Sequence, residues 1–182
     1  SLLNKLSGKN AAEGNWVPPS YQAVLGAGDP RTGGLYRNFL AETEKRITEL
    51  NLLGYTPKIR GLYWMQGEED MGSPATYKTA FTYFVSDIRR DLGGIVGEDL
   101  SELPVYVGQI SRTTGGRTDN IPQAFIEMQN TLAELPYVFV IQSGKYLVGT
   151  EYDSGCYDDY HWSYRSQLAI GRLVGHAMLE HL

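Results

Sequence analysis

Apolar residues recur with a helical period in several stretches of the chain. The first of these runs from residue 34 to a closing glycine, Gly54, and places Leu35, Phe39, Ile47 and Leu50 near one face, with charged residues between them. This pattern predicts an amphipathic helix. The preceding residues, 1–33, are dense in Gly, Asn and Pro and show no sustained period, so they are predicted to be irregular loop.

Three further helices are predicted along the chain. Ser73 followed by Pro74 is typical of a helix start, and Gly93-Gly94 is expected to end the same helix. Its apolar face contains Tyr77, Phe81, Phe84, Ile88 and Leu92. Another helix is predicted over 121–135, and the last follows Trp162 through the stretch "SQLAIGRLVGHAML".

Short apolar runs at 59–65, 104–110 and 137–142 lie between these helices and predict buried strands. Alternating helices and strands favour an α/β fold with three α/β/α layers and a mainly parallel sheet, in a single domain spanning 1–182. Such sheets place their sites beyond the carboxyl ends of the strands. The loops after residues 65, 110 and 142 are therefore expected to converge.

The charge and the apolar runs of the chain argue against two classes of protein, those that bind nucleic acid and those that bind or span membranes. A net charge of −5 and a pI near 5.2 argue against a general partner of nucleic acid or anionic membranes, and no apolar run is long enough to span a bilayer. The single cysteine, Cys156, excludes an intrachain disulfide, and its acidic neighbours disfavour a reactive thiolate.

Asp158 and His161 are separated by two residues just before the last helix. This spacing lets a carboxylate accept from one imidazole nitrogen while the other faces outward, which is the base-and-orienter half of a Ser-His-Asp arrangement. Asp159 is a competing partner, and a capping Asp beside a surface His is the plain structural alternative. His176 and His181 are expected to be solvated or packing residues.

Two stretches resemble blocks of the sialate O-acetylesterase-like and acetylxylan-esterase-like branch of the SGNH hydrolases. "GLYWMQGEED" (61–70) resembles the block with a strand followed by Gln-Gly-Glu, and "DDYHWSYRSQLAIGRLVG" (158–175) resembles the last block, Asp-x-x-His before a helix. "LPVYVGQIS" resembles the middle strand, and the resemblance covers most of residues 34–178. It implies a flavodoxin-like fold and a serine esterase that removes acetyl groups from carbohydrates.

The resemblance also implies roles for individual residues. His161 would be the general base and then acid, and Asp158 its orienting carboxylate. The side-chain N–H of Gln66 would hold the oxyanion, Gly67 would allow a tight turn, and Glu68 would brace the loops around the base.

The acids that follow differ in how well they match the block. Asp70 matches its final acid and is a candidate cap for the next segment, whereas Glu69 replaces a usual small residue.

The nucleophile of that family lies in a Gly-x-Ser block after the first strand, and no such block occurs in this sequence. "NKLSGKN" faintly resembles the second block, which would make Gly8 a backbone donor to the oxyanion. The expectation is that the first strand and the serine come from an upstream segment or a second chain, since a sheet without that strand has an uncovered edge. Ser111 and Ser143, which follow strands, are substitute candidates.

Two other functions remain open. A non-catalytic carbohydrate-binding relative would use aromatic side chains as stacking surfaces: Tyr146, Tyr152, Tyr157, Tyr160 and Trp162. A divalent-metal site would use Glu68, Glu69, Asp70 and Asp158. The esterase reading implies no cofactor, no metal and an acetylated carbohydrate as partner. No nucleic acid and no membrane are expected from the charge and the apolar runs. The sequence itself does not give the location, and the inferred glycan substrate favours a secreted or periplasmic one.

Overall fold

The computed structural model describes residues 1–3, 13–114, 120–145 and 161–181. They form two compact units: Ser1–Arg60 with Thr79–Leu103, and Gly61–Lys78 with Pro104–Leu182. The boundary between the units falls within one helix. The prediction of a single domain over 1–182 stays a prediction.

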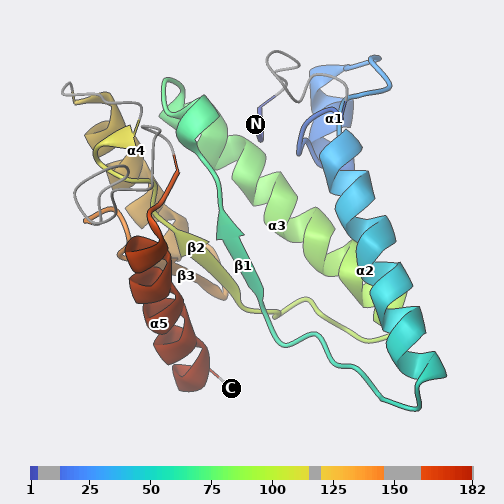
Figure 1. Ribbon diagram of the computed structural model, residues 1–182. Coiled ribbons are helices and arrows are strands. Elements are labelled where there is room, and N and C mark those ends of the chain that lie inside the picture. Colours follow the sequence, from blue (N-terminus) through green and yellow to red (C-terminus); the bar gives the residue numbers. More distant parts are fainter. Residues whose placement is uncertain (4–12, 115–119, 146–160, 182) are drawn as a thin grey trace. The chain divides into compact units, whose positions relative to one another are not determined.

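The second unit contains a parallel sheet with the strand order β1-β2-β3. The strands are β1 (Leu62–Met65), β2 (Val105–Gly108) and β3 (Val138–Ile141), each within a predicted strand. Leu62 pairs with Val105, which pairs with Val138, so the three carboxyl ends lie at one edge of the sheet (Figure 1). The predicted α/β fold with a parallel sheet is confirmed.

Helix α5 (Tyr164–Glu180) covers one face of this sheet and contacts β2 and β3 (Figure 1). Ile170 and Val174 of α5 pack in a buried cluster with Tyr106 and Ile141. Alternation along the strands puts Met65 and Phe139 on the same face. The last helix, predicted from its period, is confirmed and begins earlier than the apolar pattern, because Ser163 caps it by accepting from the Ser166 backbone N–H at 3.2 Å.

On α4 (Ile121–Thr131), Phe125, Ile126 and Gln129 are buried, and a 3-10 turn, η3 (Leu132–Glu134), follows it. The helix predicted over 121–135 is therefore confirmed in its first part and tightens at its end. Gln129 donates to the Gly108 carbonyl and accepts from the Ile110 N–H, which fixes α4 beside the end of β2.

The first unit contains α1 (Pro19–Leu25), α2 (Gly34–Leu52) and most of α3 (Pro74–Val96). The prediction of irregular loop throughout 1–33 is wrong at α1. Pro19 occupies the first helical position, where its missing N–H costs nothing, and Gly26 closes the helix with φ +58°. The same proline and glycine that suggested a loop are the boundaries of this helix.

Two details of the predicted helices differ from the structure. Gly93 and Gly94 do not end α3, which continues to Val96 before Gly97 takes φ +68°. A Cβ on Gly93 would lie 2.7 Å from the Glu98 carbonyl oxygen, so the returning chain requires a small residue there. In α2 the buried side chain is Tyr36, whereas Leu50 of the predicted apolar face is exposed.

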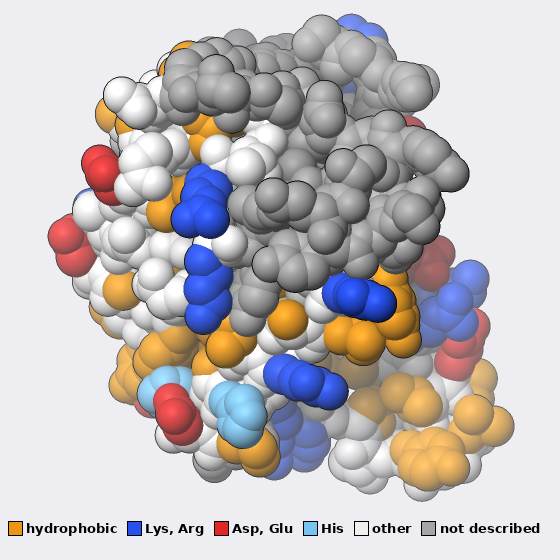
Figure 2. Space-filling view, turned by 60° about the vertical axis from the view of Figure 1, so that its left-hand side comes forward, with side chains coloured by type: hydrophobic (Ala, Val, Ile, Leu, Met, Phe, Trp, Pro, Cys, Tyr) orange, Lys and Arg blue, Asp and Glu red, His pale blue; other side chains and the backbone are white. Residues whose placement is uncertain are grey.

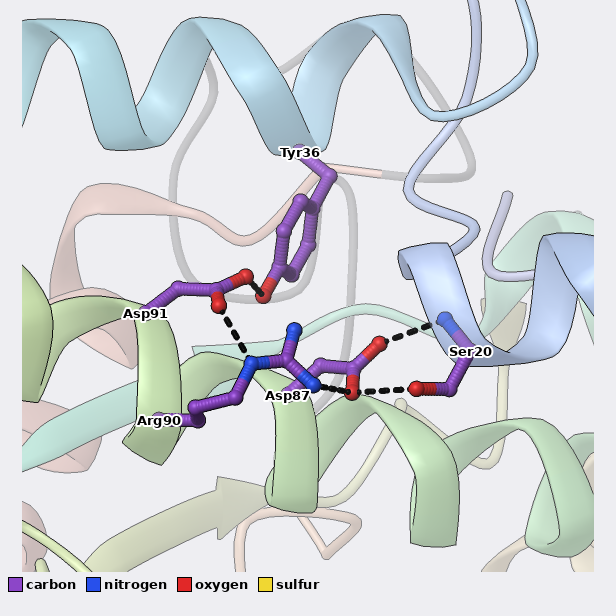
Figure 3. A network of polar contacts seen from close by, with 5 residues as sticks. All are labelled: Ser20, Tyr36, Asp87, Arg90 and Asp91. Carbon is purple, nitrogen blue, oxygen red and sulfur yellow. Dashed lines mark hydrogen bonds and ion pairs between the residues drawn. The ribbon is translucent and has the colours of Figure 1, made fainter.

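A polar network joins the helices of the first unit (Figure 3). Asp87 of α3 accepts from the Ser20 N–H at 2.8 Å and from the Ser20 hydroxyl at 2.7 Å, which ties α1 to α3. Asp91 accepts from the Tyr36 hydroxyl at 2.7 Å, which ties α2 to α3. Arg90 bridges both carboxylates at 2.7 Å.

Candidate functional site

The turn after β1 carries the first group of predicted site residues. Gln66 follows the strand directly, Gly67 turns the chain with φ +157°, and Glu68–Asp70 form a 3-10 turn, η1. A side chain at position 67 is excluded twice, by this φ and by space. An added Cβ would lie 2.5 Å from the Phe125 ring and 2.9 Å from Ile110.

The Gln66 amide is held by one carboxylate. Its Nε2 donates to Asp70 Oδ2 at 2.9 Å, and Asp70 is fully buried. The carboxylate of Asp70 therefore orients the Gln66 amide, and the predicted role of Asp70 as a cap stays a prediction. Gln66 Oε1 is buried and has no hydrogen-bond partner among the residues that the structure describes. A buried acceptor without a donor is costly, so this oxygen is a candidate contact for a water or substrate group.

Glu68 lies near His161. Burial raises the pKa of the Glu68 carboxyl, and hydrogen bonds from the backbone of Glu68 and Gly67 together with the nearby His161 imidazole partly oppose that rise. The same carboxylate lies close enough to Tyr63 to add to the effect of burial, which raises the pKa of that phenol to about 12. The structure therefore brings Glu68 and His161 together, as the prediction of one converging site requires.

His161 is exposed and precedes α5, and the next residue anchors this segment to the sheet. The Trp162 indole N–H points to the Met65 sulfur at 3.1 Å, and the Tyr63 hydroxyl lies 3.6 Å from the same sulfur. Met65 is the residue directly before Gln66. The sequence analysis gave Trp162 only a stacking role, and this contact to β1 was not foreseen.

The remaining predicted residues have different outcomes. Asp158 and Gly8 lie outside the described residues, as do Cys156, Asp159 and the four loop tyrosines. Ser111 and Ser143 are fully buried, and the Ser143 hydroxyl donates to the Gln109 carbonyl at 2.8 Å. Neither hydroxyl is presented to a substrate.

The other two histidines have packing or surface positions. His181 stacks on Phe139 with ring centroids 3.7 Å apart, and His176 is exposed on α5. Figure 2 shows histidine side chains at the surface beside hydrophobic ones. The expectation that these two histidines are solvated or packing residues agrees with these contacts.

The described residues also bear on the metal and membrane alternatives. Within the described part of the chain, no three His, Cys, Asp or Glu side chains are grouped so that they hold a metal ion. Asp158, one member of the predicted acidic set, is not among them. No helix in the described ranges is long and apolar enough to cross a membrane.

Comparison with known families decides the relationship that the motifs suggested. The family described as carbohydrate esterase, sialic acid-specific acetylesterase, matches residues 12–180. The chain belongs to this family. The matched range includes both the Gln66–Asp70 turn and His161, and Glu68 of that turn lies near His161 in this carbohydrate esterase chain. No curated protein matches the chain.

Proposed function

We propose that this chain carries the histidine base and the oxyanion-binding amide of a serine-type O-acetylesterase that acts on acetylated carbohydrates. The observation that carries the proposal is the proximity of Glu68 to His161, because it joins the turn after β1 to the segment before α5. The family match supports the ester-hydrolase chemistry.

In the proposed reaction, His161 takes the proton from a serine hydroxyl as the serine oxygen attacks the acetyl carbonyl carbon. His161 then gives that proton to the sugar oxygen as the ester C–O bond breaks, which leaves an acetyl-enzyme and a free sugar hydroxyl. A water attacks the acetyl group by the same route and releases acetate. Asp158 is the proposed orienting carboxylate for the imidazole.

Gln66 is suited to the oxyanion role because Asp70 fixes one of its amide hydrogens and leaves the second available. A donor held in place before the reaction stabilises the developing charge without reorganisation, and one such donor typically contributes about 3 kcal/mol to lowering the barrier. Gly8 is a proposed second donor through its backbone N–H.

The serine is proposed to come from outside this sequence, on an upstream segment or on a second chain. The sequence contains no Gly-x-Ser block, and the two serines that follow strands are buried. Labelling the complete protein with a fluorophosphonate and mapping the modified peptide by mass spectrometry tests this origin. A label on Ser111 or Ser143 would contradict it.

The catalytic assignment is tested with an aryl acetate and the complete protein. His161→Ala is expected to lower kcat by at least about a thousandfold, because no other group replaces the base. His176→Ala, at an exposed histidine of α5, is the matched control and should keep the wild-type rate. Full activity of His161→Ala would remove His161 from the mechanism.

A further inference from the structure

Tyr77 of α3 reaches the turn after β1 by a hydrogen bond: its hydroxyl donates to the Gln66 carbonyl at 3.0 Å. The side chain is fully buried, and Tyr77 lies in the first turn of α3, where its N–H binds the Ser73 carbonyl. A phenol in such a place needs a partner for its polar end, and here the partner that accepts from it, the Gln66 carbonyl, belongs to the candidate site.

The Tyr77 hydroxyl is the middle of a longer series of hydrogen bonds. The Trp64 indole N–H donates to the Tyr77 oxygen at 3.0 Å, and Tyr77 donates onward to the Gln66 carbonyl. That carbonyl belongs to the Gln66–Gly67 peptide, and Gly67 on its other side binds the Glu68 carboxylate through its backbone. The bond that Tyr77 donates is therefore the one that reaches the turn, whereas the bond from Trp64 only satisfies the Tyr77 oxygen from the core side.

The Tyr77 ring is also held by packing, in addition to the hydrogen bonds of its hydroxyl. Phe125 lies edge-on to it, with ring centroids 4.8 Å apart and planes at 71°. The same Phe125 closes the space beside Gly67, so Tyr77 and Gly67 share one wall. The turn therefore has little freedom to move while this wall and the hydroxyl contact are intact.

We propose that Tyr77 is a positioning residue that fixes the Gln66–Gly67 peptide and thereby aims the Gln66 side-chain amide at the reacting ester. Tyr77 touches no substrate in this arrangement and acts through Gln66. The inference rests on the proposed function for its kinetic consequence, whereas its structural part concerns the turn alone.

The kinetic test uses Tyr77→Phe in the complete protein, assayed with an aryl acetate well below the melting temperature. The ring and its packing are kept and the hydroxyl is lost, so kcat is expected to fall about tenfold while KM changes less than about twofold. Trp64→Phe is the matched control. It removes the donor to Tyr77 but keeps the contact from Tyr77 to Gln66, so it should lower stability and leave kcat within about twofold of wild type.

The Gln66→Ala background decides whether Tyr77 acts through Gln66. There Tyr77→Phe should change kcat by less than about twofold, because the side chain that it aims is gone. An equal loss in both backgrounds, an unchanged kcat for Tyr77→Phe, or the same loss in Trp64→Phe would overturn the positioning role.

A measurement without catalysis separates this inference from the proposed function. In ¹⁵N-labelled protein, Tyr77→Phe should shift and broaden the Gly67 backbone amide and the Gln66 side-chain amide, and Trp64→Phe should leave both sharp. Unchanged resonances in Tyr77→Phe would overturn the inference even if the enzyme is active. Absence of any esterase activity in the wild type would instead overturn the proposed function and leave the resonances to decide on Tyr77.

Discussion

The network around Arg90 and the turn after β1 both contain buried polar groups, and they differ in how fully those groups are hydrogen-bonded. In the first unit, Arg90 bridges Asp87 and Asp91, and the remaining contacts come from Ser20 and Tyr36 (Figure 3). In the second unit, Gln66 keeps a buried oxygen without a donor among the described residues.

Glu68, in the turn after β1, is a second group there that is not fully paired. Within the described ranges it makes no ion pair with Lys or Arg, and its ionised form is favoured by hydrogen bonds from the backbone of Glu68 and Gly67 and by the nearby His161 imidazole. A network that is fully paired contributes to stability, whereas one with an open acceptor and a carboxylate disfavoured by burial retains capacity for a ligand. The two regions should therefore respond to mutation in opposite ways.

The largest expected effect is on the rate, from the turn after β1. Gln66→Ala should lower kcat by about ten- to a thousandfold, the range expected for losing one oxyanion donor. The free energy of unfolding should change little, because the variant loses the contact to Asp70 and also removes the buried oxygen that has no donor. Aryl acetate hydrolysis and chemical denaturation measure the two quantities.

Gln142→Ala is the control for this variant, since Gln142 is an exposed amide that follows β3 and binds Asn130. It should keep the wild-type rate. If Gln66→Ala also keeps that rate, Gln66 has no place in the site and the contrast between the two networks loses its functional meaning.

The network of the first unit should give the opposite result. Asp87→Ala removes the acceptor of the Ser20 N–H and hydroxyl, and it is expected to lower the free energy of unfolding by about 2 kcal/mol, or the melting temperature by roughly 4–8 °C. Its kcat below the transition should match the wild type. Asp99→Ala, which removes an exposed carboxylate that binds the backbone N–H and the side chain of its near neighbour Ser101, should have a much smaller effect on stability. A fall in kcat without loss of stability would contradict a structural role for Asp87.

The smallest effect is expected from Glu68 and depends on pH. Because burial raises the pKa of Glu68 in the folded protein, its protonated form favours folding below the ordinary value of 4.5, and this contribution is lost as pH rises through the raised pKa. Glu68→Gln does not titrate, so it should be more stable than the wild type at neutral pH, and the advantage should shrink as pH falls.

Thermal unfolding of both proteins between about pH 8 and about pH 4 measures this difference. A stability difference that stays constant over the range would show that ionisation of Glu68 is not its source.

Much of the sheet was predictable because its strands are short apolar runs between clear turn residues, and the structure places β1, β2 and β3 inside all three. Local signals were less reliable for proline and glycine, which occur both in loops and at helix ends. Pro19 begins helix α1 and Gly26 ends it, whereas Gly93 lies inside helix α3, where the returning chain comes too close for a side chain. Propensity alone does not distinguish these cases, since tertiary contacts decide them.

The proximity of the two motif segments was predictable, whereas the side-chain contacts that connect them to the core were not. The motifs indicated Gln66, Glu68 and His161, and the parallel order of the strands indicated that they meet. The contacts of Tyr77 and Met65 were missed because both residues fit an apolar pattern. The phenol was the available signal, since a tyrosine on a buried face requires a partner for its hydroxyl.

The spacing of these contacts along the chain has a consequence for the order of folding. Gln66 meets Asp70 and Tyr77 across separations of 4 and 11 residues, whereas Met65 meets Trp162 across 97. Closing the longer loop costs about 2 kcal/mol more in chain entropy than closing the loop to Tyr77. We therefore expect the turn to be formed early, as a local product of β1 and the first turn of α3. The histidine would arrive late, so a refolding chain would acquire its substrate-binding turn before its base.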